Sequence, residues 1–209
     1  MSIALRPAPL MRAVHALLAL SLLFLAAGTA QARLIVTFWS QDFGSNFPHA
    51  FFTIHGTSDD GTIVRENFGF SPRTISPAVL FGPVKGRVDG TDEKYILKSN
   101  AHFAVTITDA QHAALRKLAV EWSEAGDPTY RLNSRNCVHF AAEAMRRVGL
   151  TVVEEKKLMK KPRSFTQSIA LLNTDRITQL NLPAAQYAAW LEAPQPPAPA
   201  QAATVTATP

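Results

Sequence analysis

The chain has 209 residues, one cysteine and a formal net charge of +5, and 47% of its residues are hydrophobic. A single cysteine excludes an internal disulfide and a metal site built from a cysteine cluster. The charge is modest and no nucleic-acid-binding motif accompanies it, so the composition gives no indication of a nucleic-acid partner.

The N-terminal 32 residues have the composition of a targeting segment. Arg6 and Arg12 precede an apolar run over residues 13–27, and Ala30-Gln31-Ala32 places small residues where a signal peptidase cuts. We therefore expect residues 1–32 to be a signal peptide, with an uncleaved membrane anchor as the alternative, and the protein to be exported, either periplasmic or secreted.

The C-terminal residues 193–209 are rich in proline and alanine and lack bulky apolar side chains, which predicts a disordered tail. One domain over residues 33–192 remains, long enough to bury a core. Without Arg6 and Arg12, 19 basic side chains stand against 16 acidic ones, a net charge of +3.

Three strands are expected at the start of this domain. Residues 33–39 and 49–55 are rich in β-branched and aromatic side chains, and residues 62–68 follow the turn sequence GTSDDG as the returning strand of a hairpin. If the turn centres on Asp59, His49 lies near Gly69, and Asn67 projects from the same face as His49.

The elements that follow are a mixture of strands and helices. Residues 69–90 contain several prolines and glycines, which predicts an irregular connection with a short strand over 79–84, placed to line one side of a cleft. Further elements are expected as strands over 95–97 and 102–107, a helix over 109–124 capped by Thr108, a helix around 165–172 and a last helix over 183–191.

The stretch YRLNSRNCVHFAAEAMRRVGL, residues 130–150, predicts an amphipathic helix that starts at the only cysteine. Asn136 is a typical N-cap, apolar residues then recur at helical spacing, and Gly149 ends the helix. Cys137 would be the first helical residue, where free N–H groups and the helix dipole favour a thiolate and lower the thiol pKa. The alternative is that Cys137 is a small buried apolar residue without chemistry.

A cysteine nucleophile needs an imidazole that takes up and returns its proton. His49 follows Pro48 at the junction of a loop and a strand, a place that often faces a cleft, although a surface or packed histidine would fit the same sequence. Asn67 is the residue that we expect to orient His49. His55 lies at the far end of the same strand, His139 is expected to pack along its helix, and His102 and His112 are given no role.

Residues 136–140, NCVHF, resemble the NCxHF signature of lecithin retinol acyltransferase-like proteins. These proteins form part of the circularly permuted branch of the NlpC/P60 papain-like superfamily, in which a strand with the catalytic histidine precedes the helix with the cysteine. The resemblance implies an α+β, permuted papain-like fold, with an antiparallel sheet packed against the helix that carries Cys137. It also implies a thioester on Cys137 and His49 as the base. The second histidine of that family falls here on Gly61.

Five basic residues crowd into one segment: Lys156, Lys157, Lys160, Lys161 and Arg163. Their functional interpretation is contact with an anionic envelope surface, and the structural one is a solvated face.

Two hypotheses of function follow from these patterns. The first is an exported cysteine hydrolase or acyltransferase that uses Cys137, His49 and Asn67 on an amide or ester, with a cell-wall peptide, a lipid or a small amide as substrate, and that needs no cofactor or metal. The second is a non-catalytic binding or scaffold module of the cell envelope on the same fold.

Overall fold

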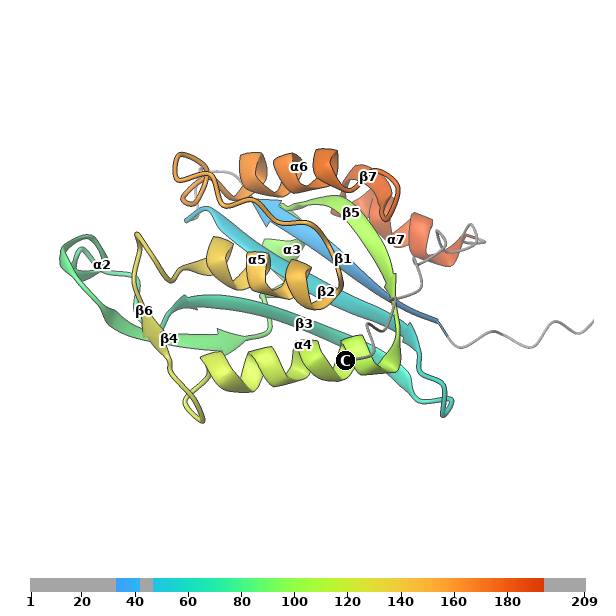
Figure 1. Ribbon diagram of the computed structural model, residues 1–209, viewed down its shortest axis with the longest axis horizontal. Helices are drawn as coiled ribbons and strands as arrows, with labels where there is room; N and C mark the ends of the chain where they lie inside the picture. Colours follow the sequence, from blue (N-terminus) through green and yellow to red (C-terminus); the bar gives the residue numbers. More distant parts are fainter. Residues whose placement is uncertain (1–32, 42–46, 194–209) are drawn as a thin grey trace, which may run out of the picture. The chain divides into compact units, whose positions relative to one another are not determined.

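The computed structural model describes residues 33–41 and 47–193, which form an α+β domain built on a seven-stranded antiparallel sheet (Figure 1). The expected signal peptide over residues 1–32 and the tail beyond residue 193 lie outside the described residues. The strands are β1 (Arg33–Gln41), β2 (His49–Thr57), β3 (Ile63–Pro72), β4 (Val84–Asp89), β5 (Asn100–Ile107), β6 (Thr129–Tyr130) and β7 (Thr178–Pro183). Their order across the sheet is β6-β4-β3-β2-β1-β5-β7.

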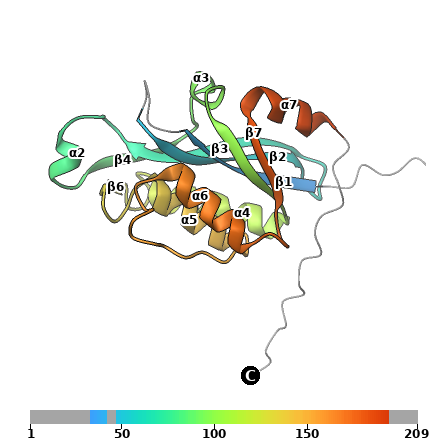
Figure 2. The ribbon, with the colours of Figure 1, turned by 90° about the horizontal axis from the view of Figure 1, so that it is seen from above.

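Helices cover both faces of this sheet. The described residues form six: α2 (Ala78–Phe81), α3 (Glu93–Ile96), α4 (Asp109–Trp122), α5 (Cys137–Arg147), α6 (Pro162–Leu172) and α7 (Ala184–Glu192). Figure 2 shows α4, α5 and α6 on one side of the sheet and α3 and α7 on the other. α5 packs on β2 and β3, and α6 packs on β1, β2 and β5. The cysteine helix therefore lies over the centre of the sheet.

Strand alternation in β2 divides the molecule into two cores. Ala50, Phe52 and Ile54 are fully buried in the larger core under α4, α5 and α6. Phe51 points to the other face, where it belongs to a smaller cluster with Trp39 and Tyr187. Because successive side chains of a strand point to opposite faces, His49 shares the face of Phe51.

Residues 69–98 differ most from the sequence prediction. β3 extends to Pro72, and the expected strand over 79–84 is wrong: residues 78–81 form the single helical turn α2, and β4 begins only at Val84. The expected strand over 95–97 is also wrong, because the Asp92 side chain accepts a hydrogen bond from the N–H of Lys94 at 2.9 Å and starts α3 instead. β6 and β7 have no counterpart in the prediction.

The caps of α4 and α5 confirm the helix starts that the sequence predicts. Thr108 and Gln111 form a capping box at α4, and Asn136 and His139 form one at α5. α5 ends at Arg147, and Gly149 just beyond its C-cap has a φ of +85°, the left-handed conformation that glycine adopts without strain.

Asn136 holds three segments together at the start of α5. Its side-chain oxygen accepts hydrogen bonds from the N–H groups of Val138 and His139, and its amide donates to the carbonyls of Leu132 and Met159 at 2.7 and 2.8 Å. The side chain is almost fully buried. Asn136 therefore fixes the place of Cys137 relative to the loops on both sides of the helix.

We expect Asn136→Ala to lower the free energy of unfolding by roughly 2–4 kcal/mol, because a cap contributes about 1 kcal/mol and two carbonyls also lose their donor. Urea denaturation measures this change. The matched control is Asn133→Ala, an exposed residue of the same loop whose side-chain oxygen accepts a hydrogen bond from Lys160, with an expected change within about 0.5 kcal/mol. Equal losses in the two variants would contradict the account of this cap.

Candidate functional site

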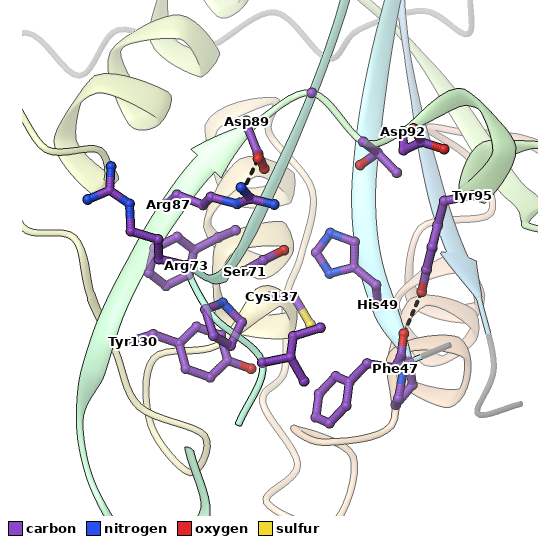
Figure 3. Close-up of a pocket in the computed structure, with 16 residues that line it drawn as sticks. Phe47, His49, Ser71, Arg73, Arg87, Asp89, Asp92, Tyr95, Tyr130 and Cys137 are labelled. Atoms are coloured by element: carbon purple, nitrogen blue, oxygen red, sulfur yellow. Dashed lines mark hydrogen bonds and ion pairs between the residues drawn. The ribbon is translucent and has the colours of Figure 1, made fainter. Parts of the chain in front are cut away.

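A cavity of about 500 Å³ opens where β2 begins, and both Cys137 and His49 line it (Figure 3). Its other lining residues are Phe47, Pro48, Phe70, Ser71, Pro72, Arg73, Ile75, Arg87, Asp89, Gly90, Thr91, Asp92, Tyr95 and Tyr130. Many of them come from residues 69–90, the segment that the sequence places beside a cleft. The fold thus brings the cysteine and histidine singled out by the sequence to one cavity.

Cys137 lies at the first position of α5, against the backbone of β2. The N–H groups of Ala50, Cys137 and Val138 interact with its sulfur and favour the thiolate, but the side chain is only 6% exposed. Burial outweighs these N–H groups and raises the pKa of the Cys137 thiol to about 11. The lowered thiol pKa expected from the helix start is therefore wrong: in this structure Cys137 is a neutral thiol at neutral pH.

His49 is the first residue of β2, and its ring packs among aromatic side chains. It stacks on Phe51 with ring centroids 5.9 Å apart and meets the edge of Tyr95 at 6.0 Å. Tyr95 is itself held by a hydrogen bond from its hydroxyl to the carbonyl of Phe47, 2.6 Å long. Burial lowers the pKa of His49 to about 4, so the imidazole is neutral at neutral pH.

Gly69 makes the room in which the His49 ring lies. A Cβ added at Gly69 would come within 2.4 Å of His49 Nε2, closer than non-bonded atoms approach. Its strand partner on β4 is Asp89, and the carboxylate of Asp89 pairs with Arg87 at 2.8 Å. The glycine therefore lets the imidazole extend over β3 toward β4.

Asn67 occupies another place than the sequence predicts. Gly69 pairs with Phe51 rather than with His49, which moves the register by two residues and sets Asn67 opposite Thr53. A two-residue shift preserves the face, but it carries Asn67 further along the sheet, and Asn67 is not among the residues that line the cavity. Its oxygen accepts a hydrogen bond from the N–H of Thr91, which does line the cavity.

Sequence reasoning missed several polar residues near His49. Asp89 and Thr91 reach the cavity from the end of β4 and the loop after it, and Gln41 is the direct partner of His49 on β1. Gln41 Oε1 and Thr91 Oγ1 are buried and have no hydrogen-bond partner among the residues that the structure describes. The glycines at positions 69 and 90 were the one signal in the sequence for a close approach here, but they do not identify which polar residues approach.

The other histidines of the described chain are engaged elsewhere. His139 completes the α5 capping box, His112 pairs with Glu66 at 2.9 Å, and His102 contacts Ser40 at 2.7 Å inside the sheet. His55 lies beside Tyr187 at the far end of β2. Each contact is away from the cavity of Cys137.

A smaller apolar cavity of about 310 Å³ adjoins the first. The two share Phe47, Pro72 and Ile75 as lining residues. Ser76, Pro77, Val79 and Leu80 complete the smaller one, and the last two belong to α2, in the connection between β3 and β4. Apolar surface therefore continues outward from the site.

The basic segment before α6 is exposed at Lys156, Lys157, Lys160, Lys161 and Arg163. Lys157 pairs with Glu155 at 2.8 Å, and Lys160 donates to Asn133 at 3.1 Å. Contact with an anionic surface stays a prediction.

Within the described residues, no three or more His, Cys, Asp or Glu side chains are grouped in a way that could hold a metal ion, and no helix there has the length and hydropathy to cross a membrane. Comparison of the chain with protein-family models, curated proteins and solved structures finds no match.

We expect Cys137 to react with iodoacetamide more slowly than free cysteine at pH 7, because only the thiolate reacts and its pKa is raised to about 11. The rate should climb about tenfold per pH unit without levelling off below pH ~10. Intact-mass spectrometry follows this one thiol directly, since the chain has no other cysteine. A rate that levels off below pH 8 would show a stabilised thiolate and contradict the burial argument.

Proposed function

We propose that the protein is an exported cysteine-dependent hydrolase or acyltransferase that acts on an amide or ester through a thioester on Cys137. The observation that carries this proposal is the cavity lined by both Cys137 and His49, from a helix start and a strand start far apart in the sequence. A nucleophile and a base in one accessible cavity are the minimum that acyl transfer by cysteine requires.

The neutral state of both groups defines the first step. Because the thiol pKa is raised and the imidazole pKa is lowered, a resting thiolate and imidazolium are disfavoured. His49 acts instead as a general base during attack: the thiol proton passes to the imidazole while the sulfur bonds to the carbonyl carbon. The oxyanion then collapses, the C–N or C–O bond breaks, and the leaving group takes the proton from His49.

Backbone N–H groups are the hydrogen-bond donors that would stabilise the oxyanion. Those of Cys137 and Ala50 lie against the sulfur, next to where a carbonyl oxygen would develop charge. The thioester is released when water, or another acceptor in a transferase, attacks it and gives its proton to His49. The sulfur then recovers a proton and the thiol is restored.

The papain-like assignment belongs to this proposal. It is supported by the order of the elements, since the strand with His49 precedes the helix with Cys137, and by an antiparallel sheet packed on that helix. The NCVHF sequence at the start of α5 adds the resemblance to permuted NlpC/P60 proteins.

The lining of the adjoining cavity indicates the polarity of the acyl group in the substrate. Its walls are mostly apolar, and it joins the site through Phe47, Pro72 and Ile75. Of the substrates that the sequence leaves possible, this apolar lining favours an amide or ester with an apolar acyl group, because burial of such a group stabilises the bound state.

A non-catalytic envelope module is the second candidate, and the burial of Cys137 favours it. A thiol that is 6% exposed and has a raised pKa is also what a packing residue would show. The exposed basic segment would then hold the domain on an anionic surface.

The two candidates differ in the fate of Cys137. We expect the protein to form a thioester with an activated acyl ester such as p-nitrophenyl butyrate, and Cys137→Ser and His49→Ala to reduce p-nitrophenol release at least 100-fold, since general-base catalysis contributes about 10²–10⁴-fold. Intact mass and absorbance at a series of ester concentrations measure both effects.

The matched control is His55→Ala, which removes an imidazole from the same face of the same strand. Its rate should stay within about twofold of the wild type. Equal rates in wild type, His49→Ala and His55→Ala would contradict the catalytic pair and favour the envelope module.

The apolar cavity predicts a preference for longer acyl chains. Each methylene that enters the cavity contributes up to about 0.8 kcal/mol to binding. We therefore expect kcat/KM to rise up to roughly fourfold per added methylene in the series from acetate to octanoate esters. Leu80→Asp should flatten this series, because Leu80 lines the cavity. Phe81→Asp is the control, a neighbour that is 87% exposed and does not line it. A series that is flat in the wild type would rule out the apolar subsite.

A further inference from the structure

The hydroxyl of Thr91 is a buried polar group without a partner on the wall of the cavity. Thr91 lies in the loop that follows β4, and its Oγ1 makes no hydrogen bond within residues 33–41 and 47–193, the described part of the chain. Burying a hydroxyl without a hydrogen-bond partner costs free energy. The unpaired hydroxyl of Thr91 therefore indicates that a partner is available to it in another state of the site.

That hydroxyl lies beside the imidazole of His49. The position of a Cβ on Gly69 is 2.4 Å from His49 Nε2 and 3.2 Å from Thr91 Oγ1, so the two atoms are at most the sum of these distances apart. Nε2 is the ring nitrogen on the Gly69 side. Nδ1 is the other ring nitrogen, and in the proposed mechanism it is the one that exchanges a proton with the Cys137 thiol.

The backbone of Thr91 is held in place from β3. Its N–H donates a hydrogen bond to the side-chain oxygen of Asn67. The preceding residue is Gly90, and a Cβ there would lie only 3.2 Å from that same oxygen. Asn67 and Gly90 thus fix the loop that presents the hydroxyl.

We infer that Thr91 is a positioning residue whose Oγ1 accepts a hydrogen bond from Nε2–H of His49. This inference rests on the proposed function and deepens it. With the proton held on Nε2, the imidazole keeps Nδ1 unprotonated and able to take the proton of Cys137. The two atoms are not hydrogen-bonded in the structure, so the bond that we infer requires a rotation of the ring about χ2, a soft torsion.

Two neighbours could compete for this role, and the contacts disfavour both. The Asp89 carboxylate is engaged by Arg87 at 2.8 Å, and no Asp89 atom is among the three nearest to the Gly69 Cβ position. Gln41 pairs with His49 from β1, the strand on the other side of β2 from Gly69. Thr91 is the one with a free acceptor on the Nε2 side.

The same geometry assigns a different role to Asn67. The sequence suggests that Asn67 orients the imidazole directly, whereas its contact in the structure is with Thr91. In this inference Asn67 acts indirectly: it holds the backbone of Thr91, and Thr91 orients His49.

The test reads the His49 tautomer by two-bond ¹H–¹⁵N NMR on the full domain at pH 7, with His49→Gln to assign the signals. We expect the Nε2–H tautomer in the wild type, a mixture of tautomers in Thr91→Val, and recovery in Thr91→Ser, which restores the hydroxyl. Asp89→Asn should leave the tautomer unchanged. Thioester formation should slow roughly tenfold in Thr91→Val and recover in Thr91→Ser.

Gly69→Ala should also produce a mixture of His49 tautomers. Its Cβ would displace Nε2 and also crowd Thr91 Oγ1 at 3.2 Å, so the tautomer should become mixed although residue 91 keeps its hydroxyl. Gly82→Ala is the matched control, since no atom lies within 4 Å of its Cβ position.

An unchanged tautomer in Thr91→Val, or a loss of the Nε2–H form in Asp89→Asn alone, overturns the inference. Because the tautomer is read without turnover, this failure is separate from that of the proposed function. If Thr91→Val shifts the tautomer while no variant of Cys137 or His49 changes ester cleavage, the hydrogen bond is supported and the catalytic role of the site is overturned.

Discussion

The first turn of α5 packs against the start of β2, and the rest of the site depends on that contact. Asn136 fixes the turn from within, through two hydrogen bonds to N–H groups and two to carbonyls of the flanking loops. The sulfur of Cys137 then meets the N–H of Ala50, the residue after His49. One buried asparagine and one strand backbone thereby place Cys137 beside the strand that carries His49.

Burial holds the side chains of Cys137 and His49 in place and also keeps both of them uncharged. The aromatic residues Phe51 and Tyr95 that position His49 are the ones that remove its imidazole from water, and the sheet that receives Cys137 removes its thiol. Both pKa shifts oppose a resting ion pair. A neutral pair leaves the proton transfer to the moment of attack, and a protonated thiol is also less open to oxidation, because the thiolate is the form that oxidants attack.

The sequence predicts the parts of this site that are local and leaves open those that depend on strand pairing. The cap at Asn136, the start of α5 at Cys137 and the alternation of β2 follow from residues within a few positions of each other. The hairpin register was two residues off because turn composition does not fix where a β2–β3 pair closes. Thr91 could not be found in this way, since only the β3–β4 pairing brings it over Gly69. The pKa of Cys137 was predicted in the wrong direction because the sequence shows the helix start and does not show the depth of burial.

The most direct test of the central claim is a crystal structure of the protein after reaction with an activated apolar acyl ester. The account predicts a thioester on Cys137 Sγ, its carbonyl oxygen within hydrogen-bond distance of the N–H groups of Cys137 and Ala50, and His49 Nδ1 facing the sulfur. Acylation at another residue, or a thioester with the His49 ring turned away from it, would contradict the account.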